Sequence, residues 1–226
     1  MSDLRLARLL QLASPTLPVG AYSYSQGLES AVEAGIVHDA ESAQCWIADV
    51  LELSIAGMEA PVLLRLLAAW NNKDFVAVVY WNALFLASRE SAELRAETVQ
   101  MGYSLTCLLS EISEEDASSF AQLQRIDEPA FPTAYACAVA QWRIESSSAL
   151  IAYLWSWIEN QVMAAIKTVP LGQTAGQKIL LVLGARLETI AQAAAARHDN
   201  ELGNFAPGLA MLSSRHETQY SRLFRS

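Results

Sequence analysis

ELRAETVQMGYSLTCLLSEI, residues 93–112, is the stretch of the sequence that decides the fold class. Its apolar and small side chains recur every three or four positions across more than four turns: Leu94, Thr98, Met101, Leu105, Leu108 and Ile112. Because an α-helix turns once every 3.6 residues, this spacing places all of them on one helix face. The stretch therefore predicts a long amphipathic helix with one face against a core.

The same spacing continues on both sides of this stretch. It recurs in three further groups: Ile47, Val50, Leu51, Ser54 and Met58; Leu150, Leu154, Trp157 and Gln161; and Leu183, Arg186, Leu187, Ile190 and Ala194. Sustained alternation of apolar and polar residues, the pattern of strands, is absent from the sequence. We predict an all-α protein: a single globular multi-helix bundle of about nine or ten helices over residues 1–226, with an N-terminal arm at 1–24 and a basic C-terminal tail at 209–226.

Prolines and caps mark the expected helix boundaries. Asp39 is an expected N-cap for the helix that runs through Met58. Pro61 can open a helix, because a proline in the first turn loses no helical hydrogen bond. Pro129 and Pro132 enclose a short loop, and Pro170 separates two long helices. No linker and no solenoid repeat interrupts this pattern.

Composition limits the classes of partner. Hydrophobic residues make up 53% of the 226 residues and charged residues 17%, which is enough apolar surface for a large core. An apolar excess of this kind often includes surface that a partner covers. The formal net charge of −9 disfavours nucleic acid, because phosphate binding needs a basic face.

The three cysteines, Cys45, Cys107 and Cys137, lie far apart and have no CxxC spacing. A disulfide framework or zinc site is therefore not expected, and we interpret all three as small buried hydrophobes in a reducing compartment. The uncharged stretch 9–28 is broken by Pro15, Pro18 and Gly20, which is unlike a signal sequence or a membrane span. We expect a cytoplasmic protein with no membrane partner.

Four glycines lie inside helical patterns: Gly27, Gly102, Gly176 and Gly184. A helical glycine costs about 1 kcal/mol relative to alanine, so each is expected to allow close approach of another chain segment. The approach can be made within the domain or across a subunit interface, and the sequence does not decide between them.

No pattern of catalytic residues stands out. The three histidines, His38, His198 and His216, lie on separate segments without metal-ligand spacing. A nucleophile elbow, a phosphate-binding loop and a dinucleotide fingerprint are absent from the sequence. A site assembled from distant residues stays open.

The N-terminal loop, residues 14–29 with the sequence SPTLPVGAYSYSQGLE, is the most distinctive segment. Its two prolines hold the chain extended, and Gly20 permits a turn. Ser23 and Gln26 have the spacing of a capping box that would start the next helix. The loop is either a buried connector or a surface for a partner; two tyrosines in an uncharged loop favour the second interpretation.

The C-terminal tail carries three arginines, Arg215, Arg222 and Arg225, against one acid, Glu217. On a continuing helix its apolar residues would share one face: Leu209, Leu212, His216, Tyr220 and Leu223 or Phe224. Such a segment can dock on a partner or fold back on its own acidic body.

Several segments together resemble the UreF family of urease accessory proteins. The N-terminal loop is similar to that family's N-terminal signature. The segments 93–97 and 100–102, Phe131 with Pro132, and VPLGQTAGQ at 169–177 resemble further blocks in the same order. The ending HETQYSRLFRS at 216–226 resembles the family's C-terminus. Tyr22 stands where the family often has phenylalanine.

The resemblance implies a function. Members of that family are not enzymes; with UreD/UreH and the GTPase UreG they form a complex that activates apo-urease by delivering nickel. UreF bridges the other two, its tail is associated with UreD/UreH, and homodimers are common. The resemblance therefore implies no permanently bound cofactor and no metal site in this chain, with nickel handled by the complex.

On this basis we select residues for binding partners. The candidates are Pro15, Pro18, Gly20, Tyr22, Tyr24 and Glu29 in the N-terminal loop, His216, Tyr220, Arg222, Phe224 and Arg225 in the tail, and, as lesser candidates, Gly172, Gln173, Gly176 and Gln177. We name no catalytic residue. The competing interpretations are a helical enzyme with a spatially assembled site and a structural subunit of another assembly.

Overall fold

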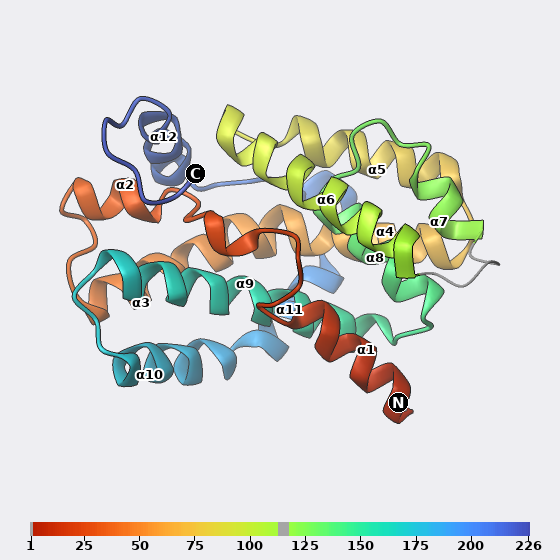
Figure 1. The fold of residues 1–226 in the computed structure, drawn as a ribbon, viewed down its shortest axis with the longest axis horizontal. Coiled ribbons are helices and arrows are strands. Elements are labelled where there is room, and N and C mark those ends of the chain that lie inside the picture. The colour runs from red at the N-terminus through yellow and green to blue at the C-terminus, as the bar shows by residue number, and fades with distance from the viewer. Residues whose placement is uncertain (1, 113–117) are drawn as a thin grey trace.

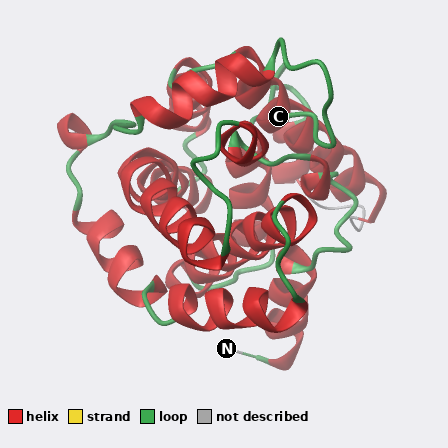
Figure 2. Cartoon of the chain, turned by 90° about the vertical axis from the view of Figure 1, so that its left-hand side faces the viewer, coloured by secondary structure: helices red, strands yellow, loops and turns green. Residues whose placement is uncertain are grey.

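A computed structural model describes residues 2–112 and 118–226, and these residues form helices and loops without a strand (Figures 1 and 2). The all-α prediction is confirmed. The α-helices are α1 (Asp3–Ala13), α2 (Leu28–Glu33), α3 (Ala40–Val50), α4 (Ala60–Asn71), α5 (Phe75–Ala87), α6 (Ala92–Ile112), α7 (Ser118–Leu123), α8 (Phe131–Gln141), α9 (Ser146–Thr168), α10 (Gln173–Gly184), α11 (Leu187–Ala196) and α12 (Pro207–His216).

Helix α9 is the central element of the bundle. It packs against α1, α2, α3, α4, α10 and α11, while α8 lies between α4 and α6. The inward face of α9 carries Leu150, Leu154, Ile158 and Val162, which are almost completely buried. The decisive stretch 93–112 forms α6, whose Leu94, Met101 and Leu105 point into the core. The predicted face is buried from Leu94 to Leu105, whereas Leu108 is half-buried and Ile112, at the end of α6, is exposed.

A nearly continuous helical rod joins α3 to α4. Asp39 caps its start: a side-chain oxygen accepts from the Ser42 amide at 2.8 Å, as predicted. The middle of the rod is a π-helix, Leu51–Glu59, and Pro61 lies in the first turn of α4. The boundary between α3 and α4 is therefore this switch to π-helical hydrogen bonding, and Pro61 does not break the rod.

A strap formed by residues 203–205 crosses the π-helix. The Gly203 amide donates to the Gly57 carbonyl at 3.2 Å, and the Phe205 amide donates to the Leu53 carbonyl at 3.1 Å. The strap approaches so closely that a Cβ on Gly57 would lie 2.6 Å from the Gly203 oxygen. It leads the chain into α12, and so fixes where the C-terminal tail begins.

All four glycines singled out in the sequence pack closely against another segment of the domain. A Cβ on Gly102 would overlap the main-chain carbonyl of Pro129, and one on Gly176 would lie 2.5 Å from Ile166 of α9. Gly184 faces Trp155, also on α9. The fourth, Gly27, was wrongly assigned to a helix interior: it has φ +80° and precedes α2.

The expectation for the cysteines holds only in part. Cys137 is buried, and burial raises the pKa of its thiol well above the ordinary value. Cys107 is half-buried and Cys45 is exposed. The inward face of α3 is formed by Ala43 and Ile47, so Cys45, two positions from each, points outward.

Within residues 2–112 and 118–226, no single helix is both long and apolar enough to cross a membrane. The pair α10 and α11, bent by 41° at the break between them, meets the length and composition only when the two are taken together.

Candidate functional site

The two arms of the chain meet. The main-chain oxygen of Ser226 accepts from the Ser25 amide at 2.7 Å, the Gln26 amide at 3.1 Å and the Ser25 hydroxyl at 2.6 Å. The Arg225 amide donates to the Ser23 carbonyl at 2.8 Å. Figure 1 shows the C-terminus next to α2. We call this unit, residues 22–29 with 216–226, the arm junction.

Glu29 anchors the tail through its main chain. One carboxylate oxygen accepts from the Leu223 amide at 2.7 Å, and the other accepts from the Phe224 amide at 2.9 Å. A carboxylate that receives two amide donors satisfies main-chain groups that have no helix or strand to pair them. Tail residues 217–226 contain no helix, so these bonds take the place of secondary structure.

His216, at the end of α12, lies between two carboxylates. Its Nδ1 is 2.7 Å from an oxygen of Glu93, and its Nε2 is 3.2 Å from an oxygen of Glu29. The histidine is fully buried, and the Arg222 guanidinium donates to the other Glu93 oxygen at 2.8 Å. We call these four residues the His216 clasp; it joins α2, α6, α12 and the tail.

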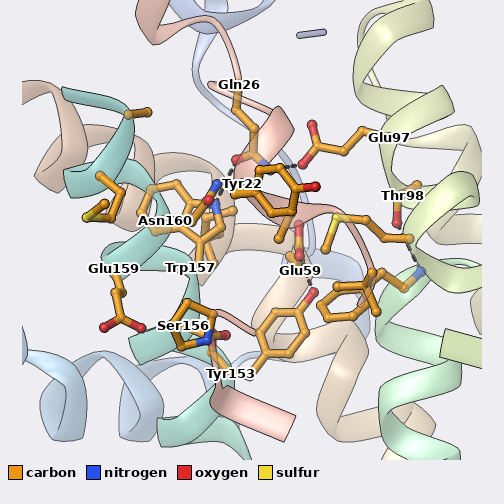
Figure 3. A pocket seen from close by; sticks show the side chains of 18 of the residues that line it. Tyr22, Gln26, Glu59, Glu97, Thr98, Tyr153, Ser156, Trp157, Glu159 and Asn160 are labelled. Carbon is orange, nitrogen blue, oxygen red and sulfur yellow. Dashed lines mark hydrogen bonds between the residues drawn. The ribbon is translucent and has the colours of Figure 1, made fainter. Parts of the chain in front are cut away.

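A cavity of about 170 Å³ opens beneath the N-terminal loop (Figure 3). The loop contributes Tyr22 and Gln26 to the cavity, and α9 contributes Trp157. Gln26 connects the walls: its amide donates to Glu97 at 2.6 Å, and its oxygen accepts from the Trp157 indole at 2.7 Å. Gln26 holds this position at φ +53°. The predicted capping box of Ser23 and Gln26 is wrong, because the Gln26 side chain turns into the cavity.

Glu97 of α6 is a fully buried carboxylate in the cavity wall. Burial raises its pKa to about 7, opposed by hydrogen bonds from Gln26 and Ser226. The Ser226 hydroxyl donates to Glu97 at 2.9 Å, so the arm junction and the cavity share this residue. The tail therefore reaches the interior of the bundle.

A second polar group lies on the far wall. The Tyr153 hydroxyl donates to Glu59, and Arg89 donates to the other Glu59 oxygen at 3.3 Å. Burial, with Glu59 adding to it, raises the pKa of Tyr153 well above its ordinary value. The Arg89 Nε has no hydrogen-bond partner among the described residues. Both oxygens of Glu59 are thus engaged by donors from this chain.

The predicted residues of the N-terminal loop differ in exposure. Pro15 and Pro18 are exposed, and Gly20 adopts φ +80°, the turn expected of it. Tyr22 is 63% exposed. Tyr24 is buried, and its main-chain carbonyl accepts a hydrogen bond from the Asn160 side chain of α9. Tyr22 is therefore available to a partner, and Tyr24 shapes the loop from within.

The tail folds back on its own body, one of the two alternatives that the sequence left open. His216 and Phe224 are buried, while Tyr220, Arg222 and Arg225 are exposed. The predicted helical face beyond His216 is wrong, because α12 ends there.

The glycine block lies elsewhere in the fold. Gly172, Gln173, Gly176 and Gln177 fall at the start of α10, which packs against α9 and α3. Gly176 is buried, while Gln173 and Gln177 are exposed. The structure brings the two arms together but gives this block a different set of neighbours.

Sequence reasoning missed the buried residues Glu59, Glu97 and Tyr153 and the half-buried Arg89. One signal was present: Glu97 lies three residues after Leu94 and four before Met101, inside the apolar stripe of α6. A carboxylate at such a position is rarely buried without partners, so its partners could have been sought.

No group of three or more histidine, cysteine, aspartate or glutamate side chains is placed to hold a metal ion among residues 2–112 and 118–226. The His216 clasp brings one histidine and two carboxylates together, but their arrangement does not suit a metal ion. Glu29 and Glu93 face opposite nitrogens of the imidazole ring, so one ion cannot reach all three side chains.

Comparison with known proteins gives the family. The UreF family model matches residues 37–184. A protein of Azoarcus sp. (strain BH72) named "Urease accessory protein UreF" is 58% identical over 99% of this chain and 96% of its own length. Proteins of the same name from Methylobacillus flagellatus and Dechloromonas aromatica are each 54% identical, covering 98% and 99% of this chain and 97% and 98% of their own lengths. The chain belongs to the UreF family of urease accessory proteins.

Proposed function

We propose that this chain is a non-catalytic maturation chaperone for urease. It acts in the cytoplasm as a homodimer and bridges the GTPase UreG and UreD/UreH in a complex that inserts nickel into apo-urease. The observation that carries the proposal is the similarity to proteins named urease accessory protein, which extends over nearly the whole chain. Nickel is the cargo of this complex and needs no resident site in the chain.

The structure supports a binding role through the arm junction. Tyr22 and Leu223, from opposite ends of the chain, are each 63% exposed next to a common hollow. Tyrosine is one of the residue types enriched in binding hot spots, and the exposed Leu223 adds apolar area beside Tyr22. Because internal bonds hold both arms, a partner that binds here loses little conformational entropy.

The coupling to the GTPase is a matter of differential affinity. A scaffold changes GTP hydrolysis or nucleotide exchange only by binding one nucleotide state more tightly than another. A homodimer would present two such surfaces related by two-fold symmetry, the commonest arrangement of soluble oligomers.

An enzyme is the competing interpretation, and one observation favours it: the cavity gathers Glu59, Arg89, Glu97 and Tyr153. A general base needs a free lone pair directed at its substrate. Each oxygen of Glu59 and of Glu97 already accepts one hydrogen bond from this chain, and these bonds hold both carboxylates within the cavity wall. This engagement supports a structural role for the polar wall.

The test is light scattering coupled to size exclusion, with the chain mixed with its cognate UreD/UreH and UreG, a GTP analogue and nickel. We expect a symmetric complex that contains all three proteins. Tyr22→Ala combined with Leu223→Ala should weaken this complex. Tyr103→Ala, which changes a tyrosine that is 60% exposed on α6, is the matched control and should not.

Two outcomes would contradict the proposal. Failure of the three folded wild-type proteins to associate would remove the bridging role. Activation of urease by a small fraction of the stoichiometric amount of this chain, without UreG, would indicate catalysis.

A further inference from the structure

Glu97 of α6 connects the two arms of the chain. One carboxylate oxygen accepts from the Gln26 side chain of the N-terminal loop at 2.6 Å, and the other accepts from the Ser226 hydroxyl of the tail at 2.9 Å (Figure 3). Both donors are themselves held in place. The Gln26 oxygen accepts from the Trp157 indole at 2.7 Å, and the Ser226 main-chain oxygen accepts from the amides of Ser25 and Gln26. We call Gln26, Glu97 and Ser226 the Glu97 bridge.

The surroundings of the Glu97 carboxylate are poorly suited to a negative charge. The side chain is buried in the wall of the cavity, whose lining includes the apolar side chains of Leu94, Met101 and Leu209. An ionised carboxylate that leaves water loses solvation, and the two hydrogen bonds of the Glu97 bridge replace only part of it. Burial accordingly raises the pKa of Glu97 to about 7 although both hydrogen bonds act to lower it.

The charged groups around Glu97 do not neutralise it. Glu59 of the π-helix repels the Glu97 carboxylate more than Arg89, which precedes α6, attracts it. Burial and Glu97 together raise the pKa of Tyr24 in the N-terminal loop. Further titratable groups on neighbouring elements are Glu29 of α2, Glu90 after α5, Glu93 of α6, Tyr135 and Cys137 of α8, Tyr153 and Glu159 of α9, Arg215 and His216 of α12, and Arg222 and Arg225 of the tail. Within residues 2–112 and 118–226, no ion pair includes Glu97.

The two segments that cover Glu97 are the parts of this region best able to move. Residues 217–226 contain no helix, and the loop that carries Gln26 is held to them by hydrogen bonds between the arms. Segments with so little secondary structure open locally at a lower free-energy cost than the core. Separation of the arms displaces Gln26 and Ser226 together and exposes the Glu97 carboxylate to water. The ionised form then regains its solvation, so ionisation favours the separated state.

We propose that Glu97 makes the closure of the two arms depend on pH: the protonated carboxyl holds the N-terminal loop and the tail together, and its ionisation favours their separation. The protonated group fits the same contacts, because one oxygen still accepts from Gln26 while the acid proton is donated to the Ser226 hydroxyl, which can accept as well as donate. The device belongs to the chain alone and does not depend on the proposed partners.

The size and sign of the effect follow from the two pKa values of Glu97, about 7 with the arms closed and the ordinary 4.5 with the carboxylate solvated. Closure is most favourable below pH 4.5, weakens as the pH rises and reaches its new level above about pH 7. The difference in pKa limits the total change in the opening equilibrium to about 300-fold. Between pH 5.5 and pH 8, opening should become about 30-fold more frequent.

Amide hydrogen exchange of the full chain, followed by nuclear magnetic resonance from pH 5.5 to pH 8, measures this opening. The amides of Ser25, Gln26 and Arg225 report it, because each donates across the junction between the arms. After correction for the intrinsic exchange rate at each pH, their opening constants in the wild type, divided by those in Glu97→Gln, should rise about 30-fold over this interval. For Glu128→Gln, which changes an exposed glutamate, the same ratio should stay constant.

A second variant tests the same device without removing the carboxylate. Ser226→Ala deletes a hydrogen bond that lowers the pKa of Glu97, so the pH at which opening levels off should move upward; Ser221→Ala, at an exposed serine of the tail, should leave it unchanged.

Two results would overturn the proposal. A ratio that stays constant for Glu97→Gln, or an unmoved pH dependence in Ser226→Ala if Glu97→Gln does not fold, would mean that Glu97 does not control the arms. Exchange of the arm amides as slow as that of Leu154 in the buried face of α9 would mean that the arms separate only on global unfolding.

Discussion

Glu97→Gln isolates the energetic cost of a buried carboxylate. Glu97 is fully buried in the cavity wall, and its oxygens accept from Gln26 at 2.6 Å and from Ser226 at 2.9 Å. A glutamine has nearly the same shape and can keep both contacts, accepting from Gln26 and donating to Ser226. The substitution therefore removes the ionisation and leaves most of the packing unchanged.

The magnitude follows from the pKa. Burial raises the pKa of Glu97 from 4.5 to about 7, so the folded chain binds this proton more tightly than the unfolded chain. The associated stability is fully present below pH 4.5 and is lost as the pH rises through about 7. At about 1.4 kcal/mol for each tenfold change in the ionisation equilibrium, the loss amounts to about 3 kcal/mol.

The assay is urea unfolding followed by far-ultraviolet circular dichroism between about pH 4.5 and pH 8. The free energy of unfolding of Glu97→Gln, minus that of the wild type, should rise by about 3 kcal/mol across this interval. Glu128→Gln is the control: Arg95 lowers the pKa of this exposed carboxyl, so its difference should stay flat above pH 4.5. A constant difference for Glu97→Gln would refute the assignment of a buried, costly carboxylate.

Three further substitutions test the fold. Gly102→Ala should destabilise the chain by about 3 kcal/mol or prevent folding, because its Cβ would overlap the Pro129 carbonyl; thermal unfolding measures this, and a wild-type Tm would contradict the packing. Asp39→Ala should cost about 1 kcal/mol through loss of the cap on Ser42, measured in urea; no loss would mean the cap contributes nothing. Tyr135→Phe should cost about 1 kcal/mol, because the buried hydrogen bond from its hydroxyl to the Ala149 carbonyl of α9 is lost; equal unfolding midpoints would exclude that bond.

The errors of the sequence interpretation share one origin. Gly27 was assigned to a helix, Gln26 to a cap and Cys45 to the core because each fits a local pattern. In the structure, Gln26 and Gly27 have positive φ, at the entry to α2. That conformation depends on contacts to Trp157, Glu97 and Ser226, which lie far away in the sequence. Local propensity cannot indicate such partners.

The sequence indicated which segments form the candidate site but not how their side chains are surrounded. The sequence indicated both arms as candidates for binding, and the exposure of Tyr22, Arg222 and Arg225 agrees with that role. It placed His216 among the partner contacts, whereas the structure buries it in a clasp. A histidine at the end of a helix looks the same in sequence whether carboxylates or solvent surround it. Its neighbours here come from α2 and α6, which periodicity cannot place in space.

The sequence by itself determined the helical class, the cap at Asp39, the break at Pro170 and, through several ordered motifs, the family. These are properties of neighbouring residues: helical period, capping and proline geometry act within a few positions. The tertiary structure alone decided that the two arms meet, that Glu97 is buried and that His216 is enclosed by Glu29 and Glu93. Those facts depend on contacts between segments up to 201 positions apart, and the packing of the whole bundle around α9 sets them.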